Sequence, residues 1–186
     1  MSNKFSTELY LKLIDIVFEE DFKQRWLSRG YRGINWIPEL SLVYQYEKKI
    51  HECSNAAFTP ITSSAREYST DSVSRIDLFI ASNGISTALE FKMDCGISDV
   101  ASDAVKLMPI VKHGDYAFVI NIKSEYARDL GDVTDRRTKM LNEQIRTFKV
   151  GQPVAVPVVS EFDFISSPAT EPKLADVICM WRIENS

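Results

Sequence analysis

Two carboxylates near the middle of the chain, Asp77 and Glu90, occupy positions from which they could share a metal ion. Each lies in a segment where apolar residues alternate with other types, which is the period of a β-strand. Asn83-Gly84 stands between the segments and predicts a two-residue hairpin turn, because both turn positions require positive φ. A hairpin closed at this turn places Asp77 directly opposite Glu90, with Cβ atoms about 5 Å apart.

Like charges placed opposite each other destabilise a pair of strands unless they share a proton or a cation. Carboxylate oxygens are the ligands that Mg²⁺ and Mn²⁺ prefer, so the pattern predicts a divalent metal site. Lys92 and Arg75 point to the same face, because side chains two residues apart lie on one side of a strand. The alternative is a solvent-exposed network of charges across the two strands. The other side chains of this face are mostly apolar or small, which favours a partly buried site.

Two predicted helices precede the hairpin. Apolar residues recur at steps of three and four over 6–28, which predicts a helix that packs on the core with the stripe Leu11, Ile14, Phe18, Phe22 and Trp26. We expect Gly30 to end this helix. A second helix is expected to begin near Pro38, which suits the first helical position. Its predicted inward face comprises Leu40, Val43, Tyr44, Glu47 and Ile50.

The remaining elements alternate between helices and strands. A short strand is expected near 65–69, and the hairpin strands at 76–81 and 85–93. A helix capped by Ser98 or Asp99 should follow, then a buried strand at 116–122, a helix at 134–148 and late strands at 153–159 and 174–183. Such interleaving favours an α/β fold with a mixed sheet flanked by helices. We predict a single domain over 1–186, with an N-terminal helix at 6–28 and a C-terminal helix and strands at 134–183.

The composition is that of an ordinary globular protein: 186 residues, 45% hydrophobic and 26% charged. Apolar runs reach only about five residues whereas a membrane span needs ~20, so no membrane partner is expected. The three cysteines and two histidines lack zinc-finger spacing, and the N-terminus does not resemble a signal peptide. We therefore expect reduced thiols in a cytoplasmic protein. The net charge of −4 argues against nonspecific coating of nucleic acid, but not against a nuclease with an acidic metal site.

Asp77 together with Glu90-Phe91-Lys92 resembles the motif of the PD-(D/E)XK nuclease superfamily, which includes many restriction endonucleases and recombination exonucleases. The resemblance implies a three-layer, restriction-endonuclease-like core: a helix, an antiparallel three-strand meander, a helix and a further strand. Residues 36–122 follow this order over about half of the chain. The proline that usually precedes the aspartate is absent, since Ile76 stands there.

The resemblance also implies roles for these residues. Asp77, Glu90 and the backbone carbonyl of Phe91 would hold Mg²⁺, for which Mn²⁺ can substitute. Lys92 would orient or activate the attacking water. In such families an acidic residue on the helix before the meander often completes the site, and Glu39 matches that position in order.

The role of Glu39 stays open at this stage, because an acidic residue in a first helical turn is also favoured by the helix dipole. Glu47 is the fallback on the same helix. The triplet itself is not specific either. Three other stretches fit it: Asp21-Phe22-Lys23, Glu47-Lys48-Lys49 and Glu171-Pro172-Lys173. The first two lie on predicted helices and the third in a loop, so only residues 90–92 lie on a strand opposite a second carboxylate.

Basic residues supply candidate contacts to nucleic acid. The predicted helix at 134–148 carries Arg136, Arg137 and Lys139, which could bind backbone phosphates. Arg75 and Lys106 are further candidates near the predicted metal site. An ordinary surface helix would show a similar density of charge.

The sequence therefore predicts a metal-dependent nuclease that hydrolyses phosphodiester bonds, with DNA as the default substrate because most of the resembled family acts on it. An enzyme that cuts both strands would work as a homodimer or within a larger complex. One alternative is a catalytically inactive nuclease-like binding or interaction module of a defence or recombination system. Another is an immunity or regulatory protein, for which salt-sensitive binding to DNA should be absent.

Overall fold

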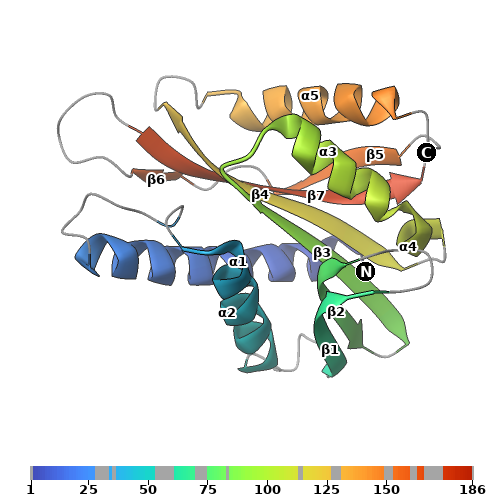
Figure 1. Cartoon of the computed structure of the whole chain (residues 1–186), viewed down its shortest axis with the longest axis horizontal. Coiled ribbons are helices and arrows are strands. Elements are labelled where there is room, and N and C mark those ends of the chain that lie inside the picture. Colours follow the sequence, from blue (N-terminus) through green and yellow to red (C-terminus); the bar gives the residue numbers. More distant parts are fainter. Residues whose placement is uncertain are drawn as a thin grey trace.

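The computed structural model describes residues 2–27, 34, 37–52, 61–69, 75–82, 84–112, 115–126, 131–148, 153–159, 163–165 and 174–185. Within these ranges seven strands form one mixed sheet in the order β1-β2-β3-β4-β7-β5, with β6 paired to β7 (Figure 1). In chain order the elements are α1 (Ser2–Leu27), α2 (Glu39–Glu52), β1 (Ile61–Tyr68), β2 (Ile76–Ser82), β3 (Ile85–Met93), α3 (Ile97–Lys106), α4 (Met108–Lys112), β4 (Tyr116–Tyr126), α5 (Val133–Thr147), β5 (Pro153–Val159), β6 (Asp163–Ile165) and β7 (Leu174–Asn185).

The strands pair as an antiparallel meander that continues into a parallel neighbour. β1, β2 and β3 run antiparallel to one another, whereas β3 and β4 are parallel. A parallel pair requires a crossover connection, which α3 and α4 supply. Beyond β4 the sheet continues antiparallel through β7 to β5. The predicted α/β class, with a mixed sheet flanked by helices, is confirmed.

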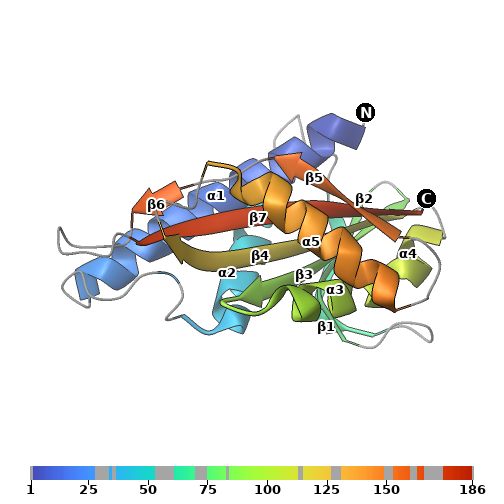
Figure 2. The same ribbon diagram turned by 90° about the horizontal axis from the view of Figure 1, so that it is seen from above.

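Helices cover both faces of the sheet (Figures 1 and 2). α1 and α2 pack on one face, where β3 contributes Leu89 and Phe91 to the core. α3 and α5 pack on the other face, where β3 contributes Ala88. Because side chains alternate along a strand, Glu90 and Lys92 belong to the face that α3 and α5 cover.

The β2–β3 hairpin has the predicted register. Its paired residues run from Ser82–Ile85 at the turn to Leu78–Leu89. Gly84 has a φ of 76°, as the turn requires, whereas Asn83 lies outside the described residues. The register places Asp77 and Glu90 immediately beyond the last paired residues of the hairpin.

The predicted packing face of α1 is wrong except for Ile14, which is partly buried against the core. Of its stripe, Phe22 is 64% exposed and Trp26 is 78% exposed. The buried face consists instead of Leu9, Tyr10, Leu13, Ile16 and Val17. These residues also recur at steps of one, three and four, so the helix carries apolar residues on two sides and periodicity alone does not select one. The helix also begins at Ser2 rather than near residue 6, and Gly30 lies outside the described residues.

Smaller corrections concern other helices. In α2, Val43 and Ile50 are buried as predicted, but Leu40 and Tyr44 are exposed, while Leu42 and Tyr46 take their places in the core. The hydroxyl of Tyr46 donates a hydrogen bond to the carbonyl of Leu9 at 2.6 Å, which joins α2 to α1.

Two helix ends also differ from expectation. α3 begins at Ile97 after Gly96, one residue before the earlier of the two predicted caps. Phe148, at the end of α5, is exposed rather than inward. Cys95 and Cys179 are free thiols, as expected, whereas Cys53 lies in a part of the chain that is not described. In the described residues, no helix combines the length and apolarity that a bilayer crossing demands.

The two faces of α1 can be told apart by truncating one residue on each. Leu13→Ala should lower the free energy of unfolding by about 2–5 kcal/mol, because Leu13 is fully buried and leaves a cavity. Phe22→Ala should change it by no more than about 0.5 kcal/mol, because most of Phe22 faces solvent. Urea unfolding of both variants measures this. An equal loss in Phe22→Ala would mean that the originally predicted stripe is the one that packs.

Candidate active site

The predicted site residues converge at the end of β3. Asp77 on β2 accepts a hydrogen bond through Oδ2 from the backbone N–H of Phe91 on β3, at 2.8 Å. Glu39, the first residue of α2, accepts one through Oε2 from the N–H of Met93, at 3.3 Å, across 54 residues of chain. Carboxylates from two other elements are therefore hydrogen-bonded to residues 91 and 93 of the strand that carries Glu90 and Lys92.

Lys92 connects the two helices around this strand end. Its Nζ lies 3.0 Å from Oδ2 of Asp103 on α3 and 3.8 Å from Oε1 of Glu39 on α2. Burial by itself would lower the pKa of Lys92, but contact with Asp103 and the charges of Glu39 and Asp77 raise it above its ordinary value. Lys92 is therefore a fixed positive charge at neutral pH and not a proton acceptor.

Glu90 is the most deeply buried carboxylate of the predicted set, with 1% of its surface exposed. Its Oε1 lies 2.5 Å from Nζ of Lys106 on α3. Burial first, and then the charge of Asp77, raises its pKa to about 8, although Lys106 acts in the opposite direction. The two strand carboxylates are thus close enough to repel each other, as the hairpin register predicted.

The pKa of Glu39 is raised as well. Burial raises the pKa of its carboxyl, Lys92 lowers it, and the charge of Asp77 raises it again. Because the charge of Asp77 raises the pKa of both Glu39 and Glu90, the three carboxylates form one electrostatic cluster. This favours a role for Glu39 in the site over a role as a helix cap alone.

The donor set suits a hard divalent cation, because it consists of three carboxylates and the nearby backbone carbonyl of Phe91. A cation placed among them would stabilise the ionised form of Glu90, whose pKa is raised. In the side-chain arrangement described, however, no three His, Cys, Asp or Glu residues surround a common point suitable for a metal ion. Lys106 supplies the positive charge beside Glu90 instead.

Of the two basic residues predicted near the metal site, Lys106 lies within the charged cluster, whereas Arg75 is a surface cation. Lys106 Nζ lies 3.5 Å from Oδ1 of Asp103 and donates a hydrogen bond to the carbonyl of Arg75 at 2.9 Å. The Arg75 side chain is largely exposed and pairs with Glu67 at 2.7 Å. A fully solvated charge network is contradicted by the burial of Glu90 and by Asp103, whose side chain is 13% exposed.

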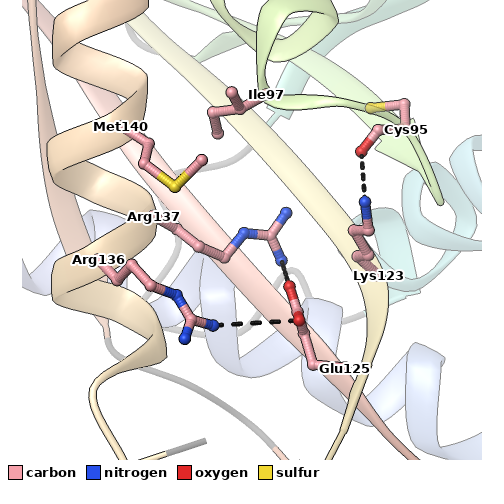
Figure 3. A pocket seen from close by; sticks show the side chains of 7 residues that line it. All are labelled: Cys95, Ile97, Lys123, Glu125, Arg136, Arg137 and Met140. Atoms are coloured by element: carbon pink, nitrogen blue, oxygen red, sulfur yellow. Dashed lines mark hydrogen bonds and ion pairs between the residues drawn. The ribbon is translucent and has the colours of Figure 1, made fainter. Parts of the chain in front are cut away.

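The predicted basic stretch of α5 divides into two groups. Lys139 is exposed on the helix surface. Arg136 and Arg137 instead line a pocket between α5, the end of β4 and the start of α3 (Figure 3). Arg137 is only 5% exposed, which sequence periodicity could have shown, because it lies one turn before the inward residue Leu141.

Two further polar residues of this region are not among the predicted metal ligands or catalytic residues, although Asp103 lies with Lys106 on the predicted polar side of its helix. Asp103 holds Lys92, and its signal was a carboxylate three residues before Lys106 on one helix. Asn121 is fully buried on β4, and its signal was a polar side chain in an otherwise apolar strand. Its Nδ2 donates a hydrogen bond to the carbonyl of Lys92 at 3.0 Å.

Three tyrosines whose rings could stack on nucleic-acid bases, Tyr44, Tyr46 and Tyr68, have other contacts in the structure. Tyr46 is buried and packs edge to face against Phe91. Tyr68 stacks on Phe79 with ring centroids 4.4 Å apart. Only Tyr44 is largely exposed, beneath the guanidinium of Arg66.

Comparison with known proteins adds no relative to this geometry: no family model matches the chain, and neither a curated protein nor a solved structure is similar to it.

Proposed function

We propose that this protein is a metal-dependent nuclease that hydrolyses phosphodiester bonds in DNA, with a restriction-endonuclease-like core of the PD-(D/E)XK type. The observation that carries the proposal is the meeting of Asp77, Glu90, Lys92 and Glu39 at one strand end, from three different elements. Partly buried charged residues with shifted pKa values that come together from distant parts of the sequence are typical of a functional site.

The order of elements supports the same proposal. α2 precedes the antiparallel meander β1-β2-β3, α3 follows it, and β4 then pairs in parallel with β3. The resembled superfamily has this order, with the aspartate on the second strand of the meander and the (D/E)XK triplet on the third.

The roles follow from the contacts. Asp77, Glu90 and the Phe91 carbonyl would hold Mg²⁺, with Glu39 beside them. The bound ion would polarise the scissile phosphate and lower the pKa of a coordinated water. Lys92 is kept protonated by Asp103 and directs its charge at the phosphate oxygens, where negative charge develops during hydrolysis. Asp103 acts as a positioning residue through Lys92.

A catalytically inactive nuclease-like module is the second candidate. The contact that favours it is Lys106 on Glu90, because this lysine already neutralises a predicted metal ligand. Metal binding separates the two candidates, since a binding module has no need of a divalent ion on Asp77 or Glu90.

The test is calorimetric titration of Mn²⁺ into the wild type, Asp77→Asn and Asp115→Asn, with and without a short DNA duplex. Asp77→Asn keeps an oxygen that can accept from Phe91 N–H but loses the charge. Asp115→Asn is matched, because Asp115 makes the same kind of contact, to Ser86 N–H at 2.9 Å, outside the candidate site.

We expect saturable binding in the wild type and Asp115→Asn, and at least ~10–100-fold weaker binding in Asp77→Asn, the loss typical even of outer-shell changes at metal sites. Binding that is equal in all three proteins would place the metal elsewhere. No Mn²⁺ binding by the wild type, with duplex present, would favour the inactive module.

A further inference from the structure

The pocket beside α5 has a composition unlike an ordinary surface depression. Its volume is about 320 Å³, and its lining comprises Cys95, Ile97, Lys123, Glu125, Arg136, Arg137 and Met140 (Figure 3). Three of these side chains are cationic and one is anionic, which gives a formal charge of +2 (3 − 1). The volume exceeds that of a phosphate group, and the positive charge of the lining favours an anionic ligand.

Arg137 is the buried centre of this pocket. One guanidinium nitrogen, Nη2, donates a hydrogen bond to Oδ1 of Asn121. The other, Nη1, is shielded from solvent and has no hydrogen-bond acceptor in the described part of the chain. Oε1 of Glu125 lies 3.9 Å from it, which is too far for a hydrogen bond. A buried donor without an acceptor is costly, so a ligand that brings an oxygen acceptor is favoured here.

The other two cations of the pocket, Arg136 and Lys123, also favour a ligand with oxygen acceptors. Arg136 lies 4.0 Å from Oε2 of Glu125, again beyond a hydrogen bond. Lys123 Nζ donates to the carbonyl of Cys95 at 3.3 Å, which leaves two of its three donors. In Figure 3 the side chains of Arg136 and Arg137 both approach Glu125. Glu125 thus approaches both guanidinium groups without completing their hydrogen bonding, and Arg136 also lies 3.8 Å from Oδ1 of Asp132.

The pocket is tied to the candidate active site through Asn121. This residue pairs with Lys92 across β3 and β4, and it contacts both Arg137 and the carbonyl of Lys92. Lys123 follows two residues later on the same face, so its Cα lies roughly 8 Å from that of Lys92 by strand spacing. A DNA strand bound at Lys92 would therefore place a neighbouring phosphate group within reach of the pocket.

We propose that this pocket binds a phosphate group of the nucleic acid, separate from the one that is cut. The inference rests on the proposed nuclease function for the identity of the ligand. Arg137 supplies the buried fork, Arg136 and Lys123 supply further charge, and Glu125 competes for the same donors until the phosphate enters. A phosphate at a strand end and a phosphate within the strand share this chemistry.

Binding of inorganic phosphate tests the pocket directly. Calorimetry in EDTA at constant ionic strength would compare the wild type with Arg137→Gln, Arg136→Gln, Glu125→Gln and Arg146→Gln. Arg146 is the matched control, because it is an exposed arginine of α5 that does not line the pocket.

We expect phosphate to bind the wild type and Arg146→Gln equally. Arg137→Gln should bind at least tenfold more weakly and Arg136→Gln several-fold more weakly, whereas Glu125→Gln should bind several-fold more tightly because the competing carboxylate is gone. Misfolding would not weaken phosphate binding in Arg137→Gln and tighten it in Glu125→Gln. Arg136, which is partly exposed, keeps the test valid if Arg137→Gln unfolds. An adventitious ion only, with the same weak affinity in every variant, would overturn the proposal.

Oligonucleotides with and without a 5′-phosphate distinguish the two sources of the group, measured by fluorescence anisotropy in EDTA. If the pocket binds a strand end, Arg137→Gln abolishes the preference for the phosphorylated strand. If it binds an internal phosphate, Arg137→Gln weakens the binding of both oligonucleotides equally. Equal affinity of Arg137→Gln and wild type for both strands would overturn the inference. Because no metal is present, failure of Mn²⁺ to bind at Asp77 would remove the nuclease proposal without altering these results.

Discussion

Lys92→Gln is expected to slow DNA cleavage by about 10²–10³-fold while Mn²⁺ binding is retained. Removal of one donor that stabilises charge in a transition state has a cost of this size in other enzymes. Lys92 carries its charge permanently, since Asp103 lies 3.0 Å away and raises its pKa. It does not belong to the proposed metal ligands, so the substitution should lower the rate and leave the metal in place.

Single-turnover cleavage of a labelled duplex measures this rate, and calorimetry measures the metal. Lys48→Gln is the control, because Lys48 is an exposed lysine of α2 whose ion pair, with Glu52 at 3.7 Å, lies within the same helix. Cleavage by Lys92→Gln at the wild-type rate would show that the reaction uses another site. Loss of metal together with activity would show that Lys92 supports the site structurally.

Mn²⁺ affinity is expected to fall about tenfold for each pH unit below about 8. Glu90 is buried beside Asp77, and its pKa is raised to about 8. Below that pH the carboxyl holds a proton, which a metal ion must displace, so one proton is released per ion bound. Titration at pH 6, 7, 8 and 9 should show the slope flatten above about 8. An affinity that is constant between pH 6 and 8 would contradict the assignment of Glu90 as a ligand.

The same group affects stability in the absence of metal. The folded-state pKa of Glu90, about 8, exceeds its ordinary value of 4.5, so the folded protein binds more protons than the unfolded chain between these values. Stability therefore decreases as pH rises from about 4.5 to about 8, by an amount on the order of a few kcal/mol. The raised pKa of Glu39 acts in the same direction.

Glu90→Gln removes this penalty. Relative to the wild type, the variant should become more stable as pH rises from 5 to 9, while it loses metal affinity. Urea unfolding at both pH values measures the difference, and Glu52→Gln, an exposed change on α2, is the control. A pH-independent difference between Glu90→Gln and the wild type would mean that Glu90 titrates near its ordinary pKa in the folded protein.

The hairpin and the polarity of its faces can be predicted from the sequence. Asn83-Gly84 and the alternating segments around it predicted β2 and β3, and the structure has the same register from Ser82–Ile85 to Leu78–Leu89. These features depend on turn chemistry and on neighbours within a few residues, which a sequence displays directly. The grouping of Asp77, Glu90 and Lys92 on one face follows from that register.

The surfaces that pack and the distant charges that meet could not be predicted, because they depend on tertiary contacts. α1 has two apolar sides, and its contact with α2 and the sheet buries the side around Leu13 rather than the side around Phe22. Glu39 reaches Met93 across 54 residues. The fixing of Lys92 by Asp103 and of Arg137 by Asn121 depends on how α3 and α5 cross the sheet. Such contacts depend on how whole elements pack against one another, and local periodicity does not encode that packing.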